Sequence, residues 1–279
     1  MQEKLDIGGV KVGTRNRFRL NLNLIHKLLA HIPPEGAIPS AIRGQFPELG
    51  DEKVRGVREW ADDLELTRQD MRRDFLTPLG QAVLLTKASR VETEVQEILY
   101  YKLATCKDLE VFRALVNVVL FDVSRRFDPT FDVGEIRQRI LAVEMMTRAA
   151  PKYVQSEVGT ALNALTSEEG LGKLRIVVPI DSKRYKVNSY RPDWRTAAYI
   201  LYDFWPENVS RVRIAEVVSG QNSLGRIFFL TEPQVMALLV KLEQERAIAL
   251  EVVADLSQIG LNPSMKAEDF LEMLIHDQD

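Results

Sequence analysis

The stretch from residue 54 to residue 80 constrains the fold more than any other part of the chain. Its first half is an amphipathic helix that begins near Asp51, a residue type that caps helix starts. Five apolar residues share the buried face of this helix: Val54, Val57, Trp60, Ala61 and Leu64. Polar residues 67–74 are too short a run for another helix and predict the tip of a two-stranded hairpin. Thr77 and Pro78 then cap and start the next helix. The order of helix, hairpin and helix predicts a winged helix-turn-helix.

A winged helix-turn-helix presents one helix and the adjoining hairpin on the same side, where they can contact a groove and a phosphate strand of DNA. The candidate DNA contacts are the cations of the N-terminal arm, the helices and the hairpin tip: Arg15, Arg17, Arg19, Arg43, Lys53, Arg55, Arg58, Arg68, Arg72 and Arg73. Two alternatives stay open. Arg55 and Arg58 each have an acid four residues later, so they could form exposed ion pairs on the helix. The hairpin cations could serve only solubility.

A helix followed by a basic hairpin occurs a second time. A helix opens at Pro151, and apolar and basic residues then alternate through residues 173–187. The candidate DNA contacts of this second winged-helix-like unit are Lys173, Arg175, Lys183, Arg184 and Lys186. The same alternation also suits the solvent-facing side of a half-buried sheet.

The rest of the chain predicts a mainly α fold of the α+β class. Residues 1–90 are expected to form a basic arm and the winged helix-turn-helix, and residues 91–150 a helical bundle. Residues 151–192 form the second winged-helix-like unit, and residues 193–279 an acidic α+β domain in which residues 224–230 are expected to be a turn and a strand. On the aromatic helix near residue 200, three side chains are candidates for a partner-binding surface: Tyr199, Tyr202 and Trp205.

The charge of the chain is unevenly distributed. The formal net charge is −3, which argues against nonspecific binding to nucleic acid. Residues 203–279 contain 6 Lys and Arg against 13 Asp and Glu, a balance of −7, which leaves +4 for residues 1–202. This asymmetry predicts a basic body joined to an acidic C-terminal part that holds a partner protein.

Nothing in the sequence indicates an enzyme, a metal site or a cofactor. The single cysteine, Cys106, excludes an internal disulfide and lies in an apolar helical context that favours a core thiol. His26 and His31 are five residues apart on one helix and point in different directions. The apolar stretches are too short to span a bilayer and the first residues do not form a signal sequence, so a cytoplasmic protein is expected.

Three blocks carry a resemblance to a known family. They are residues 198–205, residues 222–232 and the Leu-Thr-Pro-Leu-Gly block at residues 76–80. Together they resemble an uncharacterised bacterial winged-helix-like family found beside genes for phosphorothioate DNA modification and other phage-defence or restriction systems. The resemblance implies an accessory DNA-interacting subunit of a defence cluster.

These observations lead to one functional hypothesis and two alternatives. The hypothesis is a non-enzymatic protein that contacts double-stranded DNA and serves a bacterial DNA-modification or anti-phage complex. The first alternative is a protein–protein scaffold of such a complex that never contacts DNA, which the overall acidity favours. The second is a transcriptional regulator of the gene cluster, for which a homodimer would match a palindromic operator.

Overall fold

The computed structural model describes residues 18–86, 93–143, 151–253 and 256–276. Helices dominate this part of the chain, and its strands form small antiparallel sheets, as expected for the mixed α+β class. The predicted contacts Arg15 and Arg17 lie outside the described residues.

The first elements follow the predicted order of helices, hairpin and helix. They are α1 (Leu22–Leu29), α2 (Pro39–Gly44), α3 (Asp51–Asp63), β1 (Thr67–Asp70), β2 (Arg73–Leu76) and α4 (Pro78–Leu85). The Thr77 side chain caps α4 by accepting the N–H of Gly80 at 3.0 Å, as predicted. The predicted cap Asp51 is instead the first residue of α3, and Gly50 with φ of 71° stands at the cap position. Strand β2 pairs with β1 along one edge. Along its other edge, Asp74 of β2 forms an isolated β-bridge with Ala37.

The middle of the chain contains a buried helix and a second sheet. After α5 (Thr93–Thr105), helices α6 (Glu110–Ala114), η2 (Leu115–Leu120, π-helical) and α7 (Phe121–Ser124) follow one another without a break. The next elements are β3 (Thr130–Asp132), α8 (Val133–Leu141), α9 (Pro151–Thr166), the 3₁₀ turn η4 (Gly172–Leu174), β4 (Val177–Pro179) and β5 (Arg184–Val187). Strand β3 lies inside the region predicted as a helical bundle, yet it pairs with β5. The predicted boundary at residue 150 therefore cuts through one folded unit.

The last part of the chain again combines helices with a small antiparallel sheet. Its elements are α10 (Trp194–Phe204), β6 (Val212–Arg213), α11 (Ile214–Ser219), α12 (Leu224–Ile227), α13 (Glu232–Gln244), β7 (Ile248–Val253), β8 (Leu256–Leu261) and α14 (Ala267–His276). The prediction of a turn and strand over residues 224–230 is wrong, because α12 occupies that place. The Ser223 side chain starts this helix by accepting the N–H of Arg226 at 3.3 Å.

Three units of the chain share one topology. We define them as unit 1 (residues 37–76), unit 2 (residues 130–187) and unit 3 (residues 212–261). Each begins with a short strand or bridge, continues through helices and ends in a hairpin. The last strand is central in each, since β2 lies between Ala37 and β1, β5 between β3 and β4, and β8 between β6 and β7. The last α-helix before each hairpin is the long one, namely α3, α9 and α13. The third copy was not predicted.

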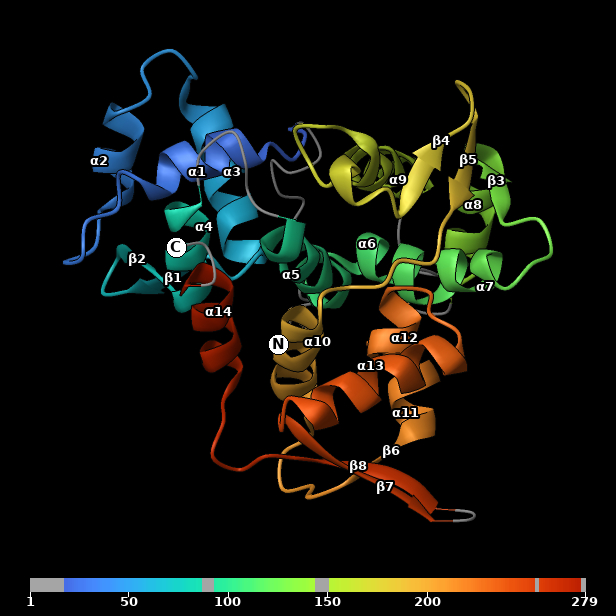
Figure 1. Cartoon of the computed structure of the whole chain (residues 1–279). Helices are drawn as coiled ribbons and strands as arrows, with labels where there is room; N and C mark the ends of the chain where they lie inside the picture. Colours follow the sequence, from blue (N-terminus) through green and yellow to red (C-terminus); the bar gives the residue numbers. More distant parts are fainter. Residues whose placement is uncertain (1–17, 87–92, 144–150, 254–255, 277–279) are drawn as a thin grey trace, which may run out of the picture.

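Helices α5 and α10 lie between the units (Figure 1). Helix α5 is buried on nearly all sides, and its Tyr100 hydroxyl donates to the carbonyl oxygen of Ile227 at 2.8 Å. Helix α14 returns from unit 3 to pack on α10 and α4. The chain end thus closes against the beginning. Within the described residues no single helix is long and apolar enough to cross a membrane, and one bent pair of helices meets the criterion by length and composition alone.

Glu97 on α5 makes stability depend on pH. The Tyr190 hydroxyl donates to its Oε1 at 2.6 Å and the N–H of Asp193 to its Oε2 at 3.0 Å. Burial raises the pKa of Glu97 from 4.5 to about 7. Between these values the unfolded chain is ionised at this position while the folded chain keeps the proton, so rising pH favours unfolding. We expect this group to lower the free energy of unfolding by about 3 kcal/mol as the pH rises from 4.5 to 7.

Urea unfolding at a series of pH values measures this effect. The Glu97→Gln variant cannot ionise at this position, so its free energy of unfolding should lack that decrease. Equal pH slopes in the native chain and the variant would contradict the assignment to Glu97.

Candidate nucleic-acid interface

The hairpin of unit 1 projects a short basic tip. Its strands pair from Thr67 opposite Leu76 to Asp70 opposite Arg73, which leaves Met71 and Arg72 as the two turn residues. Both turn residues have positive φ, of 45° and 65°, as two-residue hairpin turns require. The tip therefore points into solvent, and Met71 is 90% exposed.

The predicted hairpin cations differ in whether their side chains already have partners within the chain. Arg73 is tied down, because its Nη1 donates to the carbonyl oxygens of Glu35 and Gly36 at 3.2 and 3.3 Å. The Arg68 guanidinium lies 5.7 Å from the centre of the Phe75 ring. Arg72 is exposed and forms no ion pair with any described residue. Arg68 and Arg72 are thus the cations that this hairpin can offer to a polyanion.

Two predicted helix cations are neutralised within the molecule. Arg58 donates to the buried carboxylate of Asp74 through Nε at 2.8 Å and Nη2 at 2.7 Å. This ion pair joins α3 to β2 and neutralises Arg58 within the chain, which counts against its predicted role as a DNA contact. Arg43 pairs with Asp51 at 2.9 Å between α2 and α3.

Of the remaining cations of α3, Arg55 lines a groove and Lys53 does not. Arg55 is exposed and Lys53 half-buried, and neither forms an ion pair with a residue in the described ranges. Arg55 contributes to a groove of about 480 Å³ between α2 and α3 that also contains Asp51 and Glu52. The groove is therefore of mixed charge.

The hairpin of unit 2 keeps two unpaired cations. Asp181 accepts the backbone N–H groups of Lys183 and Arg184, both at 2.9 Å, and the Nε–H of Arg184 at 2.7 Å. These bonds, led by that of Lys183, lower the pKa of Asp181 to about 2. Arg184 is thereby neutralised, whereas the ammonium groups of Lys183 and Lys186 are exposed and unpaired as far as the described chain extends.

Lys173 and Arg175 do not belong to this hairpin. Lys173 lies in the 3₁₀ turn η4, and Arg175 ends that turn in a left-handed conformation with φ of 54°. Both are exposed. Since the hairpins of units 1 and 2 project from opposite sides of the molecule in Figure 1, the cations of the two hairpins form separate clusters.

The aromatic residues of α10 are structural. Tyr199 is buried, with 5% of its surface exposed. The Tyr202 hydroxyl donates to the carbonyl oxygen of Ala247 at 2.6 Å and accepts the N–H of Asn262 at 3.0 Å. The Trp205 indole N–H donates to the carbonyl oxygen of Val209 at 2.6 Å. The burial of Tyr199 and the internal hydrogen bonds of Tyr202 and Trp205 count against a partner-binding surface here, and that role stays a prediction.

Several polar residues of unit 2 that line a pocket were not predicted from the sequence as site residues. Arg137 on α8 and Ser156, Thr160 and Asn163 on α9 line a pocket that also contains the predicted residue Arg19. The apolar stripe of α9 is visible in the sequence, and the spacing of these small polar residues on the opposite face was the available signal.

Other reactive groups are isolated. Burial raises the pKa of the Cys106 thiol, which lies 3.9 Å from the Asp63 carboxylate. In the described ranges no group of three or more His, Cys, Asp or Glu residues is placed to hold a metal ion.

Two solved structures resemble the whole fold. An SspB crystal structure matches with a TM-score of 0.71 and 15% sequence identity, covering 95% of this chain and 87% of that chain. A magnesium ion-bound SspB crystal structure matches with a TM-score of 0.68, the same identity and the same coverage. At this identity the likeness shows the fold alone. No protein-family model and no curated protein sequence matches the chain.

Proposed function

We propose that this protein is a non-enzymatic accessory subunit of a bacterial DNA phosphorothioation or anti-phage system, and that it contacts duplex DNA. The fold likeness to SspB, a phosphorothioation-associated protein, supports the link to that kind of system. It agrees with the resemblance carried by the block at residues 76–80 and by the two blocks near the C-terminus.

We further assign units 1, 2 and 3 to the winged-helix class. The observation that carries the proposal is the repeated order of strand, helices and hairpin, with the central strand last in each sheet. In a winged helix the long helix before the hairpin faces a DNA groove and the hairpin meets the phosphates. Units 1 and 2 have unpaired cations on their hairpins, whereas unit 3 lies in the acidic part of the chain. We assign DNA contact to units 1 and 2 and partner binding to unit 3.

A salt titration with fluorescently labelled duplex DNA tests this function. Each phosphate neutralised by a cation adds about −0.9 to the slope of log affinity against log salt. The double variant Arg68→Glu, Arg72→Glu removes two such contacts, so we expect its slope to flatten by about two and its affinity at low salt to fall roughly a hundredfold. These two arginines are chosen because Arg73 is bound to main-chain oxygens.

The matched control is Lys107→Glu, Lys266→Glu, which makes the same change of charge at two exposed lysines outside the three units. Its affinity should fall much less than that of the hairpin variant. Equal losses of DNA affinity in the two variants would mean that the change in net charge weakens binding and that the hairpin is not a specific contact.

The net charge of −3 favours the scaffold as the second candidate. If neither the isolated chain nor its complex with copurifying proteins binds duplex DNA at low salt, the scaffold function replaces the proposal. A homodimer that protects a palindromic site in its own promoter would instead indicate a regulator.

A further inference from the structure

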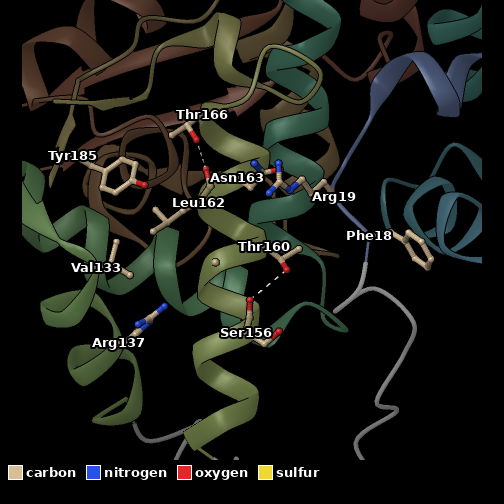
Figure 2. Close-up of a pocket in the computed structure, with 11 residues that line it drawn as sticks. Phe18, Arg19, Val133, Arg137, Ser156, Thr160, Leu162, Asn163, Thr166 and Tyr185 are labelled. Carbon is tan, nitrogen blue, oxygen red and sulfur yellow. Dashed lines mark hydrogen bonds between the residues drawn. The ribbon is translucent and has the colours of Figure 1, made fainter. Parts of the chain in front are cut away.

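A polar pocket of about 470 Å³ lies between the start of the described chain and unit 2 (Figure 2). Its walls come from residues 18–19, from α8 and α9, and from β5. Two of the lining residues are the arginines Arg19 and Arg137, and none is acidic. The pocket therefore has the charge of an anion site.

Arg19 is held over α9 by anchors on both sides. Before it, the Phe18 ring packs so closely on α3 that a Cβ atom at Gly56 would lie 2.7 Å from the ring. After it, the Asn21 side-chain amide donates to the Glu169 carboxylate at 2.9 Å. Figure 2 accordingly shows Phe18 directed away from α9 and Arg19 directed toward it. Arg19 is exposed and makes no hydrogen bond or ion pair with the part of the chain that the structure describes.

Two other lining residues have buried polar atoms without partners among the described residues. They are Nε of Arg137 and Oδ1 of Asn163. An unsatisfied buried polar group costs about 1–3 kcal/mol, so each of these atoms is expected to find a partner from outside the chain, either a water or a ligand. In Figure 2 the Arg137 guanidinium reaches from α8 toward α9, while Asn163 stands beside Arg19. A phosphate oxygen can accept from Nε of Arg137 and from the side-chain NH₂ group of Asn163, whereas Oδ1 of Asn163 is an acceptor and needs a donor such as water.

The face of α9 inside the pocket is small and polar. Ser156, Gly159, Thr160 and Asn163 follow the spacing of one helix face. A Cβ atom at Gly159 would meet no atom within 4 Å, so the glycine leaves open space over the helix. The Thr160 hydroxyl donates to the Ser156 carbonyl oxygen at 3.3 Å, a long bond that it can exchange for one to a ligand.

We propose that this pocket binds a phosphate group, with Arg19 and Arg137 as its cations and the polar face of α9 as its floor. Resting on the proposed function, we assign the phosphate to the backbone of DNA bound along unit 2. A second pocket shares Val133 and Arg137 with the first and reaches Lys183 on the hairpin of unit 2. It also contains two acids, of which Asp181 is paired with Arg184 and Asp132 caps α8. In the proposal the phosphate strand runs from Lys183 past Arg137 to α9. A soluble phosphate compound offers the same oxyanion, and the experiment separates the two sources.

The experiment uses the full chain and two probes, short duplex DNA and inorganic phosphate. Arg137→Gln removes one cation, while Gly159→Leu fills the open space without a change of charge. We expect each variant to bind duplex DNA roughly tenfold more weakly, as for one lost charge-assisted hydrogen bond. Arg137→Gln should also flatten the salt slope by about one. Lys107→Gln, which removes an exposed cation in the turn between α5 and α6, should bind like the native chain. If Gly159→Leu fails to fold, Arg137→Gln carries the test.

In the experiment with inorganic phosphate, the midpoint of thermal unfolding of each protein is measured with and without that ion. A rise in the native chain and the control that is absent from both pocket variants supports the site. If the native chain binds no DNA but shows this pattern, the proposed function fails, while the pocket stands as a site for a soluble phosphate compound. If the native chain binds DNA and the pocket variants match it in affinity, salt slope and response to phosphate, the pocket proposal is overturned and the proposed function remains.

Discussion

Gly80→Ala is expected to destabilise the folded chain by at least about 3 kcal/mol. A Cβ atom at this position would lie 2.0 Å from the carbonyl oxygen of Leu66. That oxygen already accepts the N–H of Thr77 at 3.0 Å, and the Thr77 hydroxyl donates to the carbonyl oxygen of Glu65 at 2.6 Å. Because these bonds tie the start of α4 to the end of α3, neither main-chain segment can withdraw from the new methyl group without breaking them.

The free energy of unfolding in urea measures this effect. Gly159→Ala is the matched control, because it adds the same methyl group within a helix where no atom lies within 4 Å. Alanine has the higher helix propensity, so the control should stabilise the chain by up to about 1 kcal/mol. A Gly80→Ala protein with the stability of the native chain would contradict the close approach of α4 to Leu66.

Local patterns in the sequence predicted the elements that depend on local contacts. The Leu-Thr-Pro-Leu-Gly block is one such case, since Thr77 caps α4 as its residue type indicated. Asp132, a residue type that favours helix starts, also caps α8 by accepting the N–H of Glu135 at 2.9 Å. The tip of the first hairpin also lies within the polar run that predicted it. Each of these features is fixed by residues a few positions apart.

Contacts between distant residues were beyond the reach of sequence patterns. Arg58 had an acid of the right spacing on its own helix, but its partner is Asp74 on β2. Strand β6 has only two residues and is a strand only because it pairs with β8. Its sequence is too short for an alternating pattern, so the first strand of unit 3 could not be predicted. The phosphate pocket joins Arg19 to α9, more than a hundred residues away, through a segment whose position depends on Phe18 and Asn21.

Lys102 is a buried charge at the junction of the units. Its side chain is 3% exposed, and its Nζ donates to the Glu65 carboxylate at 2.6 Å and to the Asp203 carboxylate at 2.9 Å. Burial lowers the pKa of Lys102, but Tyr199, Asp203 and Glu65 raise it more, so the net shift is upward and the ammonium stays charged. One cation on α5 thereby joins the end of α3 to α10.

Lys102→Met is therefore expected to lower the free energy of unfolding by about 2–4 kcal/mol. Methionine keeps most of the volume of the lysine chain, so the loss reports the missing charge more than a cavity. The value stays near the lower end for broken buried ion pairs, because the Glu65 and Asp203 side chains are 63% and 28% exposed and water can solvate them in part.

A double-mutant cycle in urea tests this explanation. Asp203→Asn removes the carboxylate that Lys102→Met leaves without its cation, so the double variant should be more stable than the sum of the two single losses predicts. The Tyr101 hydroxyl, which donates to Asp203 at 2.8 Å, can still donate to the asparagine oxygen. Lys241→Met is the control, because it breaks a partly exposed pair with Glu245 on α13 and should change stability by less than about 1 kcal/mol. A loss in Lys102→Met no larger than in this control would mean that packing alone joins α3, α5 and α10.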